Sequence, residues 1–89
     1  EAAARAKYLT GEYYFRAGEM EAAANAFIEA ATMYPRDRDF MASAMYKAAE
    51  ITLRIGNRRE AQALVERMEK NFPESQWSLE ARKLLEGRR

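Results

Sequence analysis

The stretch YYFRAGEMEAAANAF, residues 13–27, would form one amphipathic helix if Gly18 did not interrupt it. A glycine inside a helix costs about 1 kcal/mol relative to alanine, but its backbone readily adopts the left-handed conformation that ends many helices. A second stretch, TLRIGNRREAQALV at residues 52–65, places Gly56 in a very similar setting. We therefore predict that each glycine ends one helix and precedes a second helix that lies antiparallel to it.

An internal repeat connects the two glycines. At an offset of 38 residues Gly18 aligns with Gly56, and Pro35 aligns with Pro73. The same offset aligns further residues of similar size or polarity: Ala23 with Ala61, Phe27 with Val65, Ala30 with Met68 and Tyr34 with Phe72. Repeats of about this length are typical of stacked helical hairpins. Each copy indicates a helix, a glycine turn, a second helix and a proline that stops it.

Five helices are expected, at residues 2–17, 20–34, 40–55, 58–72 and 76–86. Asp37 or Asp39 can cap the third helix, and Ser75 can cap the fifth. Asn57 with Glu60 is similar to a capping box at the start of the fourth helix. The fifth helix would cover a face of the second hairpin that is otherwise exposed. Its apolar stripe is expected to consist of Leu79, Leu84 and Leu85.

The composition agrees with an all-α fold in a single domain. The chain has 89 residues, of which 48% are hydrophobic, and it contains only 4 glycines and 2 prolines. Alanine, glutamate, arginine, methionine and leucine are frequent, and these residues favour helix. A chain of this length fits one small domain with one core.

The small and aromatic residues of the repeat follow a recognisable pattern. The first copy has Gly11, Tyr14, Gly18, Ala23, Phe27, Ala30 and Pro35. The second has Ala49, Gly56, Ala61, Val65 and Pro73, and departs from the pattern at Thr52 and Met68. This pattern resembles the tetratricopeptide repeat (TPR) family. The resemblance implies a right-handed α-solenoid of two hairpins and a capping helix, with repeat 1 at about 4–37, repeat 2 at about 42–75 and the cap at about 76–86.

The spacing of the copies suggests a narrower resemblance. Their offset of 38 residues is longer than the usual TPR period of about 34. This spacing, with the stops at Tyr34–Pro35 and in FPES at residues 72–75, resembles TPR domains of bacterial cell-envelope proteins. Examples are the Tol–Pal-associated coordinator and the lipoprotein of the outer-membrane assembly machinery. That resemblance implies the periplasm or cell envelope. Without it the cytoplasm is expected, so the compartment stays open.

The residue types exclude several kinds of chemistry. Cysteine and histidine are both missing, so disulfides and Ser–His or Cys–His catalysis are excluded. The paired carboxylates, Glu19 with Glu21 and Glu66 with Glu69, are expected on solvated helix faces. The sequence also lacks a phosphate-binding glycine loop and the spacing of a calcium loop. We therefore expect a protein that is not an enzyme and binds no cofactor and no metal.

The charge pattern gives little reason to expect a nucleic-acid partner. The net charge is only +1, and a modest basic cluster is diluted by Glu60 and Glu66. The cluster consists of Arg54, Arg58, Arg59 and Arg67. Because single-stranded nucleic acid needs a basic groove with stacking aromatics, we expect no nucleic-acid partner. No apolar run reaches the length of a membrane span, so direct membrane insertion is not expected either.

The TPR resemblance implies a concave groove, lined by the first helix of each hairpin, that holds a peptide or a partner protein. Carried over by position, repeat 1 supplies Arg5, Tyr8, Leu9, Glu12, Phe15 and Arg16. Repeat 2 supplies Ser43, Tyr46, Lys47, Glu50, Leu53 and Arg54. Tyr8 with Glu12 would disfavour the subclass that captures a peptide carboxylate. We expect a protein–protein interaction module.

Three alternatives to the groove remain open. The groove residues can be ordinary face residues, because Glu12–Arg16 and Glu50–Arg54 are favourable i,i+4 pairs and Leu9 and Leu53 can pack. The chain can also be a structural self-assembly element, as a homo-oligomer or part of a longer solenoid, since stable stacks usually need about three repeats. A further alternative is an engineered scaffold without a native partner, because EAAAR at residues 1–5 resembles a designed helix.

Overall fold

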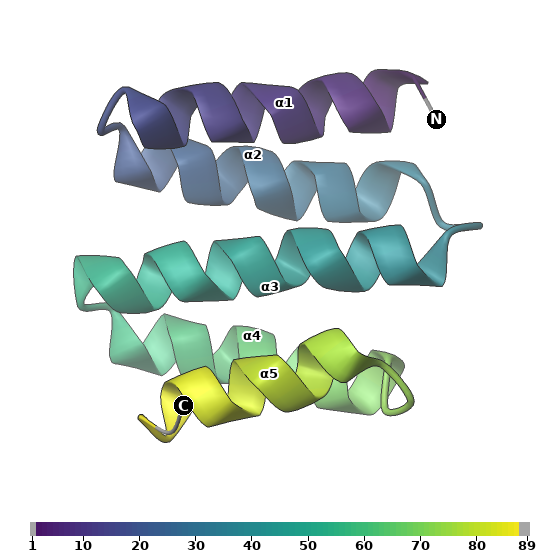
Figure 1. Cartoon of the computed structure of the whole chain (residues 1–89), viewed down its shortest axis with the longest axis vertical. Helices are drawn as coiled ribbons and strands as arrows, with labels where there is room; N and C mark the ends of the chain where they lie inside the picture. The colour runs from purple at the N-terminus through teal and green to yellow at the C-terminus, as the bar shows by residue number, and fades with distance from the viewer. Residues whose placement is uncertain (1, 88–89) are drawn as a thin grey trace.

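The computed structural model describes residues 2–87, and these residues form five α-helices and no strand (Figure 1). The helices are α1 (Ala2–Arg16), α2 (Met20–Met33), α3 (Arg38–Ile55), α4 (Arg58–Asn71) and α5 (Gln76–Leu85). The predicted all-α class and all five helices are confirmed, with every bound within two residues of its expected place. The largest shift is at the start of α3, which begins at Arg38 instead of Phe40.

Gly18 and Gly56 end α1 and α3 as the sequence predicts. Both adopt a positive φ, 82° at Gly18 and 98° at Gly56. The backbone N–H of Gly56 donates to the Leu53 carbonyl, and that of Gly18 donates to the Phe15 carbonyl. A Cβ added at either glycine would meet no atom within 4 Å, so glycine is favoured here by its backbone conformation and not by space. Residues 13–27 therefore belong to two helices.

Side chains cap α3, α4 and α5, whereas Glu19 before α2 forms no side-chain cap. Asp37 Oδ1 accepts a hydrogen bond from the Phe40 backbone N–H at 2.9 Å, which decides between the two predicted caps in favour of Asp37. Asn57 Oδ1 accepts from the Glu60 N–H at 3.3 Å, and Asn57 Nδ2 donates to Glu60 Oε1 at 3.2 Å. Ser75 Oγ accepts from the Trp77 N–H at 3.1 Å. These bonds satisfy N–H groups that a helix start would otherwise leave unpaired.

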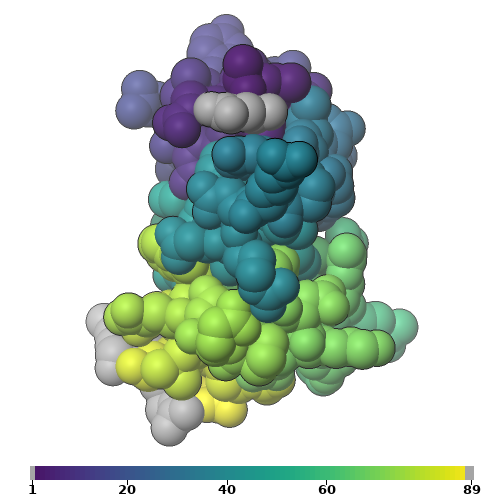
Figure 2. All heavy atoms as spheres, turned by 90° about the vertical axis from the view of Figure 1, so that its right-hand side faces the viewer, coloured from purple at the N-terminus to yellow at the C-terminus, as the bar shows by residue number. Residues whose placement is uncertain are grey.

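The helices form two layers in a slab of 32 × 30 × 19 Å. In Figure 1, α1, α3 and α5 lie nearer the viewer, and α2 and α4 lie behind them. Helix α2 packs on both α1 and α3, whereas α3 also packs on α4 and α5. Figure 2 shows α1 at one end of the longest axis and the last two helices at the other. The two glycine turns share one edge of the slab, and the two proline turns share the opposite edge.

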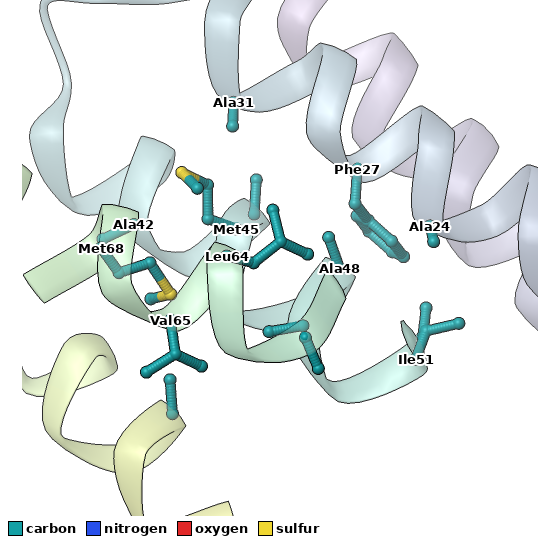
Figure 3. Close-up of a cluster of buried hydrophobic side chains, with 14 of the residues drawn as sticks. Ala24, Phe27, Ala31, Ala42, Met45, Ala48, Ile51, Leu64, Val65 and Met68 are labelled. Atoms are coloured by element: carbon teal, nitrogen blue, oxygen red, sulfur yellow. The ribbon is translucent and has the colours of Figure 1, made fainter. Parts of the chain in front are cut away.

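The core lies between the layers and is built mostly from alanine (Figure 3). Its largest fully buried side chains are Phe27, Ile51, Val65 and Met68. Gly11 belongs to the same packing, because a Cβ at this position would lie 3.0 Å from three atoms of the Phe27 ring. The absence of a side chain at Gly11 thus lets α1 approach the Phe27 ring on α2 closely.

The expected apolar stripe of α5 is wrong at one position. Leu79 is 57% exposed, whereas Ser78, Ala81 and Leu85 form the buried face of the helix. Ser78 can be buried because its Oγ donates to the carbonyls of Met68, at 3.1 Å, and Phe72, at 2.8 Å. These bonds fix the rotation of α5 about its axis, so that Leu79 points away from the core.

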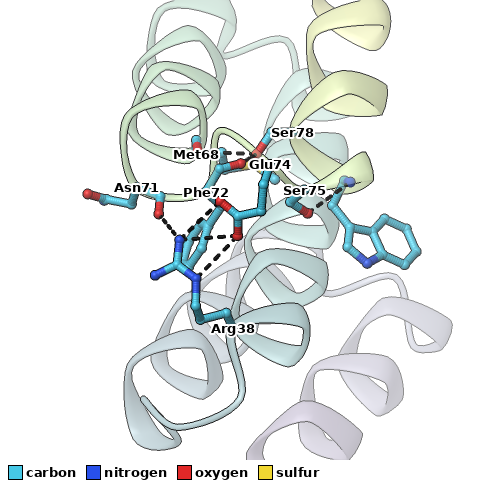
Figure 4. A network of polar contacts seen from close by, with 8 residues as sticks. Arg38, Met68, Asn71, Phe72, Glu74, Ser75 and Ser78 are labelled. Atoms are coloured by element: carbon cyan, nitrogen blue, oxygen red, sulfur yellow. Dashed lines mark hydrogen bonds and ion pairs between the residues drawn. The ribbon is translucent and has the colours of Figure 1, made fainter.

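Polar contacts join the two proline turns (Figure 4). Arg38, at the start of α3, donates to both carboxylate oxygens of Glu74 and to the carbonyl of Asn71. The same guanidinium lies 5.0 Å from the ring centroid of Phe72. A second bidentate ion pair, from Arg82 to Glu69 at 2.7 and 2.8 Å, ties α5 to α4. The Arg38 contacts hold the end of α4 and the turn after it against the start of α3, and the Arg82 pair holds α5 on α4.

Candidate binding groove

A hollow of about 240 Å³ lies between α1 and α3, on the layer that these helices share with α5. Its lining consists of Glu12, Phe15, Arg16, Phe27, Lys47, Glu50 and Ile51. We call this hollow the α1–α3 groove. Its floor consists of the apolar side chains of Phe27 and Ile51, each of which is only 2% exposed. Phe15 is half-buried and packs against the core beside them.

Five of the ten predicted partner-binding residues line this groove. They are Glu12, Phe15 and Arg16 from α1 with Lys47 and Glu50 from α3. The two helices are consecutive first helices of the repeat, so residues far apart in sequence meet here. Phe27 and Ile51 were missed as groove residues. Ile51 follows Lys47 by four residues, and this spacing could have placed it on the same helix face as Lys47.

The charged groups around the groove are not paired with each other. Within the described residues, the structure contains no ion pair that involves Glu12, Arg16, Lys47 or Glu50. The expected i,i+4 ion pairs, Glu12–Arg16 and Glu50–Arg54, therefore do not form among the described residues, and that prediction is wrong. Two carboxylates and two cations remain available to a ligand. A ligand with charges of both signs could pair with them.

Arg54 has a different role from the one its spacing suggested. Its guanidinium carbon lies 5.4 Å from the centroid of the Phe15 ring, so it contacts α1 and not Glu50. This cation–π contact joins α3 to α1 beside the groove, near the glycine turns. The Arg54 guanidinium contacts the face of the Phe15 ring instead of the Glu50 carboxylate, and the ring itself packs against the core.

Tyr8 and Tyr46 occupy equivalent places in the two repeats but have different neighbours. The Tyr8 ring packs edge-on against Phe27, with centroids 4.9 Å apart, and also contacts Phe40 at 5.6 Å. The Tyr46 ring lies 5.2 Å from that of Trp77 on α5. Neither tyrosine lines the α1–α3 groove. Tyr46 with Trp77 instead extends an aromatic surface from α3 to α5.

The two tyrosine hydroxyls lie in partly buried, acidic surroundings. Burial raises the pKa of Tyr8 above its usual value, and the charge of Glu12 adds to the rise. Burial likewise raises the pKa of Tyr46, with smaller contributions from Glu50 and Glu80. Both phenols therefore stay protonated at neutral pH and can donate hydrogen bonds to a ligand.

The remaining predicted residues lie outside the groove. Arg5 is exposed on α1, and Ser43 Oγ donates within α3 to the carbonyl of Phe40 at 2.9 Å. Leu9 is 58% exposed, so the alternative that it packs in the core is wrong. Leu53 packs against the core, which confirms the alternative that this residue has a packing role.

Metal-holding groups and membrane-spanning helices are both absent from the part of the chain that the structure describes. Among residues 2–87 no group of three or more acidic, histidine or cysteine side chains is placed to hold a metal ion. In the same range, every helix is too short or too polar to cross a membrane. The groove thus combines an apolar floor, unpaired charges and neighbouring phenols. That combination can bind side chains of another molecule.

Comparisons with protein-family models, with curated proteins and with solved structures found no match to this chain.

Proposed function

We propose that this chain is a non-catalytic, TPR-like interaction module that binds a peptide segment or a partner protein through the layer of α1, α3 and α5. In this proposal α1–α2 and α3–α4 are two hairpins of a right-handed solenoid, and α5 is its cap. The order of the helices, and the packing of α3 on α2, α4 and α5, support such a stack.

The α1–α3 groove is the observation that carries the proposal. Its volume of about 240 Å³ lies below the range of about 300–1,000 Å³ that is usual for small-molecule pockets. A hollow of this size suits a single large side chain of a longer ligand. The buried floor would remove apolar surface of that side chain from water, and Glu12, Glu50, Arg16 and Lys47 would pair with charges beside it.

The aromatic pair Tyr46–Trp77 extends the proposed surface. It lies between α3 and α5, on the same layer as the groove. A partner segment that crosses the helices could place one side chain in the groove and a second one against these rings. Tyrosine and tryptophan are common anchors in protein interfaces, because they present a large rigid surface with a polar edge.

A peptide selection tests the proposal. Random peptides displayed on phage are selected on the wild-type chain, and the enriched peptides are titrated by calorimetry. The groove variant exchanges two charges, Lys47→Glu with Glu50→Lys, so that the net charge is unchanged. We expect this variant to bind the selected peptides at least about tenfold more weakly, a loss that corresponds to about 1.4 kcal/mol.

The matched control exchanges two exposed charges on α4, Glu66→Lys with Lys70→Glu. It also keeps the net charge, but α4 lies in the other layer. Its affinity is expected to equal that of the wild type. If the selection enriches no peptide, or if both exchanges weaken binding equally, the groove is not the binding site.

A further inference from the structure

Helix α1 has an exposed apolar side that faces away from α2, on which α1 mainly packs. We call it the α1 stripe, and it consists of Ala2, Ala6, Leu9 and Tyr13. All four residues are exposed, Leu9 by 58% and Tyr13 by 69%. Their spacing of four, three and four residues places them on one side of the helix. In Figures 1 and 2, α1 lies at one end of the molecule, where its outer side is free of neighbouring helices.

We propose that the α1 stripe binds a second copy of this chain through an antiparallel α1–α1′ contact. The two-fold axis passes between the levels of residues 9 and 10. Leu9 then lies beside the other copy's Leu9, and each Tyr13 lies opposite the other copy's Ala6. Large side chains thus face small ones, which allows the two helices to pack closely. A two-fold contact of this kind uses the same surface on both copies.

Two of the three charged residues on one flank of the stripe, which are Arg5, Glu12 and Arg16, match this arrangement. Arg5 and Glu12 are two turns apart on the same flank of the stripe, and neither forms an ion pair within the described residues. In the antiparallel contact each Arg5 approaches the other copy's Glu12, which gives two symmetric ion pairs. A parallel two-fold contact would instead place this flank opposite the uncharged flank of the other copy, so Arg5 and Glu12 would gain no ion pair. The two ion pairs therefore favour the antiparallel contact.

The opposite flank of the stripe has no bulky or charged residue that would keep the two helices apart. It carries Ala3 and Thr10, which are uncharged and small. The Thr10 hydroxyl already donates to the carbonyl of Ala6 at 2.9 Å, so it does not need a new partner. A second copy is therefore favoured over an unrelated partner, because the surface is complementary to itself in both size and charge. The inference does not depend on the proposed function of the groove, although Glu12 borders both surfaces.

The size of the contact sets the expected affinity. From Ala2 to Tyr13 the helix rises about 16 Å, at about 1.5 Å per residue. One pair of helices of that length buries less than the roughly 1,200–2,000 Å² of a typical stable complex. We therefore expect a dimer that dissociates on dilution, with a Kd between about 10 μM and 1 mM.

Sedimentation equilibrium on the whole chain tests the proposal. The wild type is expected to shift from monomer to dimer as its concentration rises to about 1 mM. Leu9→Arg should leave a monomer throughout this range. Leu79→Arg is the matched control, because Leu79 on α5 is 57% exposed, almost the same as Leu9, but lies outside the stripe. A wild type that stays monomeric, or a control that loses the dimer as well, would overturn the proposal.

A charge exchange tests the antiparallel register. Arg5→Glu and Glu12→Arg should each weaken the dimer about tenfold or more, and the double variant should recover most of the loss. Two single losses without recovery would contradict the Arg5–Glu12 pairing. Circular dichroism would confirm that each variant is still helical.

Cysteine cross-linking gives an independent readout of orientation, because the natural sequence contains no cysteine. Chains with Ala6→Cys, mixed with chains with Tyr13→Cys, should form a disulfide-linked heterodimer in air. Each variant alone should cross-link far less, because equivalent residues lie too far apart for a disulfide in the antiparallel contact. Efficient cross-linking of Ala6→Cys with itself would indicate a parallel contact and refute the register.

Discussion

The guanidinium carbon of Arg54 on α3 lies 5.4 Å from the centroid of the Phe15 ring on α1. These residues stand in different repeats, 39 positions apart in the sequence. Phe15 also lines the α1–α3 groove, so the contact fixes one wall of the proposed binding site. Because α1 otherwise packs mainly on α2, Arg54 is a direct link between the two first helices.

Replacing Arg54 with glutamine should weaken this link. We expect the free energy of unfolding to fall by about 0.5–1 kcal/mol, the usual range for an exposed cation–π contact. Urea denaturation followed by circular dichroism measures the change. Arg59→Gln is the control, because Arg59 is an exposed residue of α4. Equal losses in the two variants would show that the Phe15 contact contributes nothing specific.

Gly11→Ala should destabilise the protein even though alanine is the better helix former. The new Cβ would lie 3.0 Å from three atoms of the Phe27 ring, which is in the core. Overpacking of this kind costs about 1–3 kcal/mol, and the gain in helix propensity offsets about 1 kcal/mol of it. Thermal unfolding measures the net loss. The double variant Gly11→Ala with Phe27→Leu should lose less than the sum of its two single changes, and strict additivity would argue against the clash.

Ser78→Ala should detach the start of α5 from the end of α4. Ser78 is 3% exposed, and its hydroxyl donates to the carbonyls of Met68 and Phe72. Removing a buried donor leaves these acceptors less well satisfied, at a cost of about 1–3 kcal/mol. Hydrogen exchange should speed up across α5 before the rest of the chain. Unchanged exchange in α5 would mean that Ser78 does not position this helix.

The Glu69–Arg82 ion pair should make stability depend on pH. The hydrogen bond from the Arg82 side chain lowers the pKa of Glu69 below its ordinary value of 4.5. The pair therefore stabilises the fold fully above pH 4.5, and this contribution is lost as the pH falls through the lowered pKa. Because both side chains are partly exposed, the effect should be below about 1 kcal/mol.

Glu69→Gln is the variant that tests this dependence. It should be less stable than the wild type at neutral pH, and the difference should shrink in acid, as measured by urea denaturation across the acidic range. Glu12→Gln on α1 serves as the control, because Glu12 lies in the middle of its helix and forms no ion pair within the described residues, so this change should alter stability little at neutral or acidic pH. A constant difference between Glu69→Gln and the wild type would be inconsistent with a pH-dependent pair.

The fold was predictable because its decisive signals are local. The positive φ of Gly18 and Gly56 and the caps at Asp37 and Ser75 depend on only a few neighbouring residues. The repeat also pointed to part of the core, such as Phe27 and Val65, but not to Met45 and Ile51 on the buried face of α3. Leu79 was misplaced because Ser78 is a polar residue that becomes buried through hydrogen bonds to α4, and periodicity counts it as exposed.

The site was predictable only in part because it depends on how two helices face each other. The repeat placed Glu12 and Glu50 at equivalent positions, and the structure brings both to one groove. The equivalence did not extend to Tyr8 and Tyr46, because one contacts Phe27 and the other contacts α5. Local spacing also favoured an ion pair between Glu50 and Arg54, whereas Arg54 contacts an aromatic ring on another helix.

Mapping of amide chemical shifts tests the central proposal most directly. Peptides selected on the wild-type chain are titrated into the isotope-labelled protein. We expect the largest shifts at residues that line the α1–α3 groove, above all Glu12, Phe15, Lys47, Glu50 and Ile51. Shifts concentrated on α2 and α4 instead, with the groove residues unchanged, would contradict it.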